Sequence, residues 1–291
     1  MANEAETAAT KGDLNTVYKI TKQLSGRNNT CNKPVKDKHG KLLTTEREQA
    51  ARWVQHFEEV LNRPEPNEPA DPDPSDDIDI NISPPSQAEV ETAIKAMKSG
   101  KSPGIDSLQA ELFKADAITA SMVFTDLFAK IWNHETIPKD WRKGLISKIP
   151  KKGDLSNCDN WRRITLLSIP SKVFCRVLLK RIDCALDVRL REEQAGFRKG
   201  RGCIDQIFAL RNIIEQCIEW NVPLYINFID FKKAFDSAHR ESLWKILRAY
   251  GIPHKIVTII RTFYEHFECS VIVENTQIGR ASCRERVLRL V

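Results

Sequence analysis

The 291-residue sequence lacks the features that mark membrane, secreted and zinc-binding proteins. It has no run of about 18 apolar residues that could cross a bilayer. Its acidic start differs from the basic, then apolar, start of a signal peptide. The eight cysteines are scattered without a Cys-x-x-Cys pair, which indicates reduced thiols in an intracellular protein. Aromatic residues make up only 8%, but an apolar share of 41% is ordinary for a soluble globular protein.

Basic residues are missing from one stretch and concentrated in another. Residues 64–94 contain nine acids and no Lys or Arg, so the net charge of +6 conceals a more basic remainder. Residues 139–201 carry seventeen Lys or Arg against seven Asp or Glu. Such a surplus attracts a polyanion, because each neutralised phosphate releases counterions. A set of solvated helix faces would have the same composition, so charge alone leaves both interpretations open.

A proline-rich segment divides the chain. Residues 64–85 hold seven prolines and seven acids, which predicts an extended linker that is too polar to pack. Before the linker, apolar residues at helical spacing predict a helix over 46–61, and a weaker pattern predicts one over 13–24. The expected organisation is a helical connector over 1–63, the linker, and a folded unit from residue 86 onward.

Helices dominate the expected structure after the linker. Ser86 to Glu89 has the spacing of a capping box at the start of a helix that ends before Gly100. Helical spacing of apolar residues predicts further helices over 108–134, 173–186, 204–218, 243–250 and 256–267. Short apolar runs predict strands over 144–149, 224–229 and 269–274. The run at 224–229 is nearly continuous, which is typical of a buried strand. The expected fold class is α+β (mixed α/β) and helix-rich.

The most informative stretch is Phe228-Ile-Asp-Phe-Lys-Lys-Ala-Phe-Asp236. Asp230 directly follows the predicted buried strand, where a carboxylate would face a cleft. Carboxylate and carbonyl oxygens suit a hard cation such as Mg²⁺, and Asp236 is the obvious second acid. The same spacing allows Asp230 to cap the following turn and Asp236 to cap the next helix. Spacing alone leaves both interpretations open.

The amino-acid sequences of this stretch and of four others resemble motifs of reverse transcriptases from non-LTR (LINE-type) retrotransposons. F-x-D-F-x-K-A-F-D is similar to their first catalytic motif. In the family's order, the similar blocks are residues 100–112, residues 141–155 (Trp141-Arg-Lys-Gly through Ile149-Pro-Lys-Lys-Gly-Asp-Leu155), residues 158–167 and residues 193–202. Upstream, Trp53-x-x-His-Phe-Glu-Glu is similar to the stretch that precedes the polymerase in the RTE/BovB-like branch.

The resemblance implies right-hand polymerase fingers and a partial palm over 86–277, without a thumb. It implies an RNA-directed DNA polymerase that extends a DNA primer on an RNA template with deoxynucleoside triphosphates and two Mg²⁺ ions. Asp230 would be the first catalytic and metal-binding aspartate, with the backbone carbonyl of Phe231 beside it. Phe235 would lie under the sugar and disfavour ribonucleotides, and Asp236 would hydrogen-bond within its own loop. The expected location is a nuclear or cytoplasmic ribonucleoprotein.

Two groups of residues match family positions near the substrates. Lys151, Lys152 and Arg162 match fingers positions near the incoming triphosphate and the template. Gln194, Phe197 and Arg198 match a segment that touches the template strand. For each of these residues, the alternative is a place on a basic surface without such a role.

The sequence departs from the family pattern at two places. Arg163 stands where the family has glycine. After Gln277, neither the S-G-x-x-Q-G block nor the Tyr/Phe-Ala-Asp-Asp hairpin follows, so we expect a truncated polymerase with a non-native tail over 278–291. Because one catalytic aspartate cannot position two metal ions, we expect no polymerase activity from this chain. The alternative is a non-catalytic RNA- or DNA-binding module that keeps the basic fingers surface.

Overall fold

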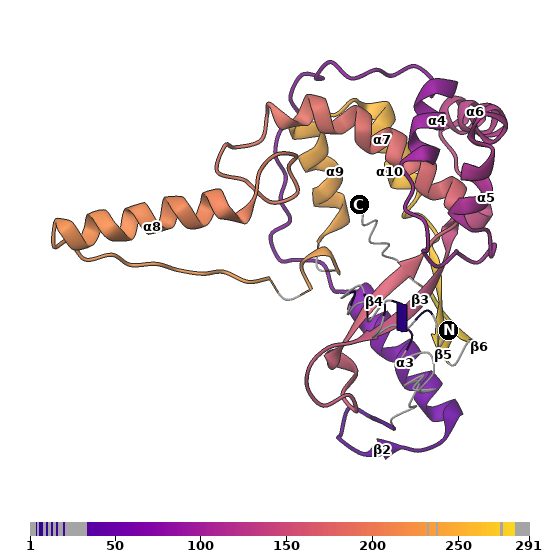
Figure 1. The fold of residues 1–291 in the computed structure, drawn as a ribbon, viewed down its shortest axis with the longest axis horizontal. Helices are drawn as coiled ribbons and strands as arrows, with labels where there is room; N and C mark the ends of the chain where they lie inside the picture. Colours follow the sequence, from indigo (N-terminus) through magenta and orange to yellow (C-terminus); the bar gives the residue numbers. More distant parts are fainter. Residues whose placement is uncertain are drawn as a thin grey trace.

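The structure is a computed structural model that describes residues 34–231, 233–236, 238–273 and 276–282, and scattered positions before them (Figure 1). Most of the predicted helix over 13–24 and most of the tail over 278–291 lie outside these residues. No helix within the described ranges is long and apolar enough to cross a membrane. Six cysteines in the described part are free thiols, as predicted: Cys158, Cys175, Cys184, Cys203, Cys217 and Cys269.

The main sheet has the strand order β4-β3-β5-β6. Strand β3 (Lys143–Pro150) forms an antiparallel hairpin with β4 (Trp161–Leu166) and runs parallel to β5 (Glu268–Val273). Strand β5 also pairs with antiparallel β6 (Thr276–Ser282). The strands predicted over 144–149 and 269–274 are confirmed.

The connector helix packs directly on this sheet. Helix α3 (Glu46–Leu61) has the predicted bounds and begins at Thr45 in a capping box with Glu48. It follows a small ribbon made of β1 (Val35–Lys36) and β2 (Leu42–Leu43). Its buried side chains share a core with strands β3 and β5: Trp53, Phe57 and Leu61 lie among Ile146, Cys158, Phe267, Cys269 and Val271. Residues 35–61 therefore form one folded layer with the sheet.

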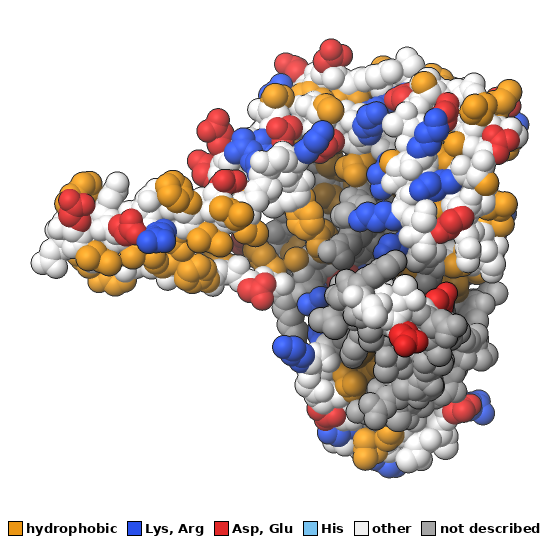
Figure 2. All heavy atoms as spheres, in the orientation of Figure 1, with side chains coloured by type: hydrophobic (Ala, Val, Ile, Leu, Met, Phe, Trp, Pro, Cys, Tyr) orange, Lys and Arg blue, Asp and Glu red, His pale blue; other side chains and the backbone are white. Residues whose placement is uncertain are grey.

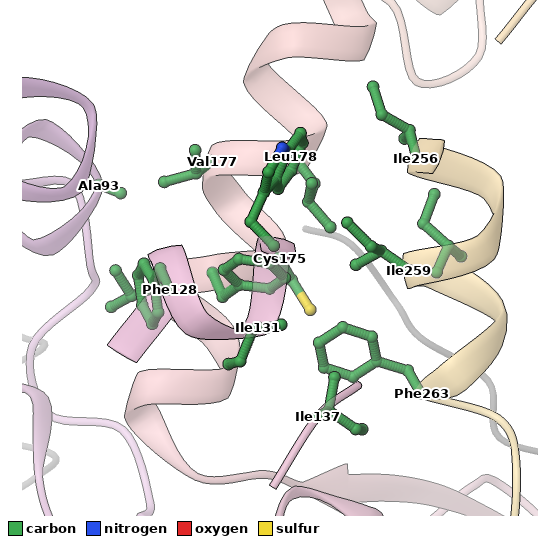
Figure 3. Packing of buried hydrophobic residues seen from close by; sticks show 14 of the residues in the cluster. Ala93, Phe128, Ile131, Ile137, Cys175, Val177, Leu178, Ile256, Ile259 and Phe263 are labelled. Carbon is green, nitrogen blue, oxygen red and sulfur yellow. The ribbon is translucent and has the colours of Figure 1, made fainter. Parts of the chain in front are cut away.

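Helix α7 (Ile169–Asp187) is the centre of the larger core. Around it pack α4 (Gln87–Lys95), α5 (Ala110–Ala115), α6 (Ala117–His134), α9 (Arg240–Ala249) and α10 (His254–Thr262) (Figure 1). Figure 3 shows Cys175 and Leu178 of α7 between Phe128 of α6 and Ile259 and Phe263 on the α10 side. The predicted mixed α/β class is confirmed.

Two helix predictions need correction. The capping box of Ser86 and Glu89 at the start of α4 is confirmed. The single helix predicted over 108–134 is instead two helices, because Asp116 leaves helical geometry and its side chain accepts a hydrogen bond from the amide of Thr119. The last predicted helix, over 256–267, is shorter, since α10 ends at Thr262.

The prediction that residues 64–85 do not pack is wrong for their second half. Ile78 and Ile80 are buried in the main core. The amide of Ile78 donates to the carbonyl of Gly251 at 2.8 Å. Gly251 has a φ of +81°, and a Cβ there would lie 2.5 Å from the carbonyl oxygen of Asp76. Two isoleucines separated by one polar residue bury alternate side chains of an extended chain, which fixes the segment on the turn between α9 and α10.

Arg181 of α7 joins the second half of the proline-rich segment to the helices. Its guanidinium forms two hydrogen bonds of 2.7 Å with the carboxylate of Glu89, and it donates to the carbonyls of Asn81 and Ser83. It also lies 5.1 Å from the centre of the Trp132 ring. The hydrogen bonds from Arg181 lower the pKa of Glu89 to about 2.

We expect Arg181→Met to lower the free energy of unfolding by about 3 kcal/mol, because it leaves a carboxylate and two carbonyls without their donor. Urea unfolding followed by circular dichroism measures the change. Arg211→Met is the matched control, since Arg211 and Glu215 form an exposed ion pair whose loss should cost less than about 0.5 kcal/mol. Equal losses in the two variants would contradict the role of Arg181.

The buried strand predicted over 224–229 is not present. Helix α8 (Cys203–Glu219) projects from the body, and the chain returns beside it in an extended, exposed course (Figure 1). Among the described residues, no backbone hydrogen bond involves residues 224–229. A strand requires a partner that supplies backbone hydrogen bonds, and the described sheet strands pair with one another instead. We call residues 203–231 the arm.

Candidate nucleic-acid interface

The residues of the first catalytic motif lie where the arm rejoins the body. Asp230 and Phe231 are both exposed, so the predicted position facing a cleft at the end of a buried strand is wrong. Within the described ranges, no group of three His, Cys, Asp or Glu side chains could hold a metal ion. One exposed carboxylate and one carbonyl do not make the donor set of a two-metal site.

The turn after Asp230 is attached to the β3–β4 hairpin by two ion pairs. Arg163 of β4 forms a salt bridge with Asp236, and Lys233 forms one of 2.9 Å with Asp159. The amide of Asp236 donates to the carbonyl of Lys233, so this acid also bonds within its own loop. Because Arg163 engages the carboxylate of Asp236, that carboxylate is not presented to a metal ion here.

Arg163 is the residue that replaces the family's glycine, and the structure shows what the added side chain contacts. Its guanidinium donates a hydrogen bond to the carboxylate of Asp236, which is distant in sequence. It also donates to the hydroxyl of Thr165 at 3.1 Å. Both side chains of the salt bridge are largely shielded from solvent. Successive strand residues face opposite sides, so Arg162 points to solvent while Arg163 points to the turn.

The turn also brings together two predicted substrate contacts. The rings of Phe235 and Phe197 pack edge to face with centroids 5.8 Å apart. Phe197 has a φ of +61°, a left-handed conformation that is unusual for a residue with a side chain. The predicted sugar-contacting and template-contacting residues are therefore neighbours, although 38 positions separate them in sequence.

The remaining predicted template contacts have different environments. The side chain of Gln194 is exposed. Arg198 instead turns back onto the C-terminal end of α7, where it forms a 2.7 Å ion pair with Asp187. It also donates to three carbonyls, of Asp187, Arg191 and Gln194. The Asp187 partner raises the pKa of Arg198. In this structure Arg198 stabilises the loop that follows α7. Its guanidinium is engaged there and is not available to contact a template strand.

The predicted triphosphate contacts lie on the hairpin beside the turn. Lys152 and Arg162 are exposed. Lys151 is exposed too, but its ammonium donates to the carbonyl of Asp159 at 2.9 Å, and Lys233 binds the carboxylate of the same residue. Figure 2 shows Lys and Arg side chains gathered in the middle of this face of the molecule, above the place where Figure 1 draws the hairpin. The exposed Lys152 and Arg162 add positive charge on the hairpin next to the turn that follows Asp230.

Sequence reasoning missed His56 of α3 as a neighbour of this site. His56 is buried against the rings of Trp53 and Phe57. Burial lowers its pKa to about 4, and the positive charge of Lys233 contributes to the shift. The one available signal was the spacing of Trp53 and His56, which places both on one helical face.

The stability of the protein should fall as the pH drops from 6.5 towards 4. The fold favours neutral His56, whereas the unfolded chain takes up a proton below its ordinary pKa, so stability is complete above pH 6.5 and decreases below it. The expected loss is on the order of 2–3 kcal/mol. Urea unfolding at pH 7.5 and pH 4.5 measures it, and His56→Gln should reduce the difference. An unchanged pH dependence in His56→Gln would contradict the assignment.

Removing one partner of the Arg163–Asp236 pair should destabilise the protein by about 3 kcal/mol, because the other charge stays shielded and unpaired. The double variant Arg163→Met/Asp236→Leu should lose much less than the two single variants together. A double-mutant cycle by urea unfolding measures this coupling. The exposed pair Arg261–Glu241 is the control, with an expected coupling below about 0.5 kcal/mol. Additive losses at Arg163 and Asp236 would show that the pair does not act as a unit.

Known proteins resemble the second half of the chain most clearly. Residues 149–289 match the family described as reverse transcriptase (RNA-dependent DNA polymerase). This segment includes the end of β3, strand β4, the arm and the turn after Asp230. The chain contains reverse transcriptase sequence, and its helix-rich mixed α/β architecture is consistent with the fingers and palm of that family.

Curated relatives come from transposable elements. The probable RNA-directed DNA polymerase from transposon BS of Drosophila melanogaster is 27% identical over 89% of this chain and 30% of its own length. The Pol polyprotein of type-1 retrotransposable element R2 of Popillia japonica is 30% identical over 58% of this chain and 23% of its own. The transposon TX1 uncharacterized 149 kDa protein of Xenopus laevis is 29% identical over 63% of this chain and 14% of its own.

The chain is similar over residues 149–289 to reverse transcriptases, and its curated relatives come from retrotransposons of the non-LTR type. It spans less than a third of the length of each of these relatives.

Proposed function

We propose that this chain supplies the fingers and the first part of the palm of an RNA-directed DNA polymerase that extends a DNA primer on an RNA template. The observation that carries the proposal is the attachment of the turn after Asp230 to the basic β3–β4 hairpin. This attachment joins two sequence blocks of the family that lie more than seventy residues apart. Asp230 is the proposed catalytic aspartate.

The exposed hairpin residues Lys152 and Arg162 support a role in binding phosphates. Lys151 would join them after releasing the carbonyl of Asp159. On the other side of the turn, Phe235 and Phe197 offer exposed ring faces next to each other. Aromatic faces stack on bases or sugars regardless of sequence, which suits an enzyme that copies any template.

We further propose that the element belongs to the RTE/BovB-like branch, which the stretch Trp53-x-x-His56-Phe57 on α3 supports. Around Asp230, the described residues offer no group of three His, Cys, Asp or Glu side chains for metal ions. Because this donor set does not fit two Mg²⁺ ions, the chain alone should not polymerise. The family match runs to residue 289, so it does not support the predicted non-native tail over 278–291.

The second candidate function is a non-catalytic nucleic-acid-binding module. The exposed position of Asp230, outside any group of three potential metal ligands among the described residues, favours it for the isolated chain. Asp230→Ala separates the two functions: it should leave RNA binding nearly intact under both, and should change Mg²⁺-dependent nucleotide binding only under the polymerase-fragment function.

We expect the chain to bind a poly(rA)/oligo(dT) duplex without extending it. Binding should weaken at least tenfold, as an order-of-magnitude estimate, between about 50 and 200 mM salt, because it rests on several phosphate contacts. Fluorescence anisotropy measures binding, and incorporation of dTTP with Mg²⁺ measures extension. Asp230-dependent extension would overturn the proposed inactivity. Failure to bind at low salt would overturn the nucleic-acid role.

A further inference from the structure

The arm displays an unusually large apolar surface to solvent. Five aromatic side chains along it are mostly exposed: Phe208 at 64%, Trp220 at 67%, Tyr225 at 92%, Phe228 at 79% and Phe231 at 73%. Figure 2 shows the apolar side chains gathered along the arm where it leaves the body. Scattered apolar residues are normal on a surface, but a continuous patch of this kind marks an interface.

The size of this surface is sufficient for a stable dimer. A large aromatic side chain buries roughly 150–250 Å² when it is fully covered. At the exposures above, the five rings alone offer on the order of 600 Å² per copy, and the aliphatic side chains of α8 add to this area. Specific interfaces bury about 800 Å² per partner.

The backbone of the arm is also suited to association. Residues 224–229 are extended and make no backbone hydrogen bond with another described residue. Such an unpaired edge is a template for another strand. Residues 220–229 contain no charged side chain, so an identical copy could pair with this segment without placing like charges opposite each other.

We propose that two copies of this chain associate through their arms, by antiparallel pairing of residues 224–228 about a two-fold axis at Ile226. This register places Leu224, Ile226 and Phe228 of both copies on one face of the ribbon. The same segment of each copy thereby supplies the backbone hydrogen bonds for the other, as a two-fold symmetric interface requires. The proposal goes beyond the polymerase function and does not depend on it.

Analytical ultracentrifugation of the full chain over a range of concentrations tests the association. The unmodified chain should sediment as a dimer that dissociates on dilution. Ile226→Lys/Phe228→Lys should raise the dissociation constant at least tenfold, because four ammonium groups would meet in the interface. Both residues are exposed, so the variant should keep the circular dichroism spectrum of the unmodified chain.

Met122→Lys/Val123→Lys is the matched control, since it places the same charges on another exposed apolar surface, on α6. It should leave the dimer unchanged. A monomer at all concentrations would overturn the proposal, and so would aggregates without a defined dimer. Dissociation by the α6 variant but not by the arm variant would overturn it too.

Disulfide cross-linking tests the register independently. Opposed residues at the two-fold axis of an antiparallel pair have Cα atoms about 4.5–5.5 Å apart, within the range of a disulfide. Mild oxidation of Ile226→Cys should therefore give a covalent dimer beyond the background of the unmodified chain. Tyr225→Cys is the control, because its two copies would lie beyond about 7 Å in this register. Cross-linking of Tyr225→Cys in preference to Ile226→Cys would overturn the register.

Discussion

The aromatic cluster around Phe174 is the contact on which the rest of the structure depends. The Phe174 ring lies 4.9 Å from Phe128 and 6.0 Å from both Trp141 and Phe263, measured between ring centroids. These four rings come from α7, α6, the segment that leads into β3, and the chain just after α10. The cluster therefore fixes where the parallel strands β3 and β5 begin, and through β3 it fixes the hairpin that holds the turn after Asp230.

Much of this architecture could be predicted because it follows from local patterns. The bounds of α3 and the capping box of α4 follow from apolar spacing and from the reach of a serine and a glutamate. The failures concern residues whose structure depends on distant partners. The apolar run over 224–229 has the composition of a strand, but no composition supplies the neighbour that a strand requires. Ile78 and Ile80 pack because the α9–α10 turn accepts them, which no pattern within a proline-rich segment reveals.

The candidate site shows the same division between local and distant information. Motif wording identified Phe197, Phe235 and Asp230, and the first two do lie together. The wording could not reveal that Arg163 would reach Asp236, or that Arg198 would turn inward to Asp187. Both outcomes depend on charges that meet only after folding. A guanidinium group can bind a phosphate or form an ion pair that stabilises a loop. Only the contacts in the folded structure show which of these two roles it has.

The parallel pairing of β3 with β5 has a kinetic consequence. Lys143 lies opposite Glu268, so pairing of these two strands closes a loop of more than a hundred residues. Contacts between residues so distant in sequence slow folding, since the entropy of closing the loop is lost before the contact forms. During that interval the sheet edges and the arm are exposed together. The central sheet therefore closes later than the helices, whose contacts are local in sequence.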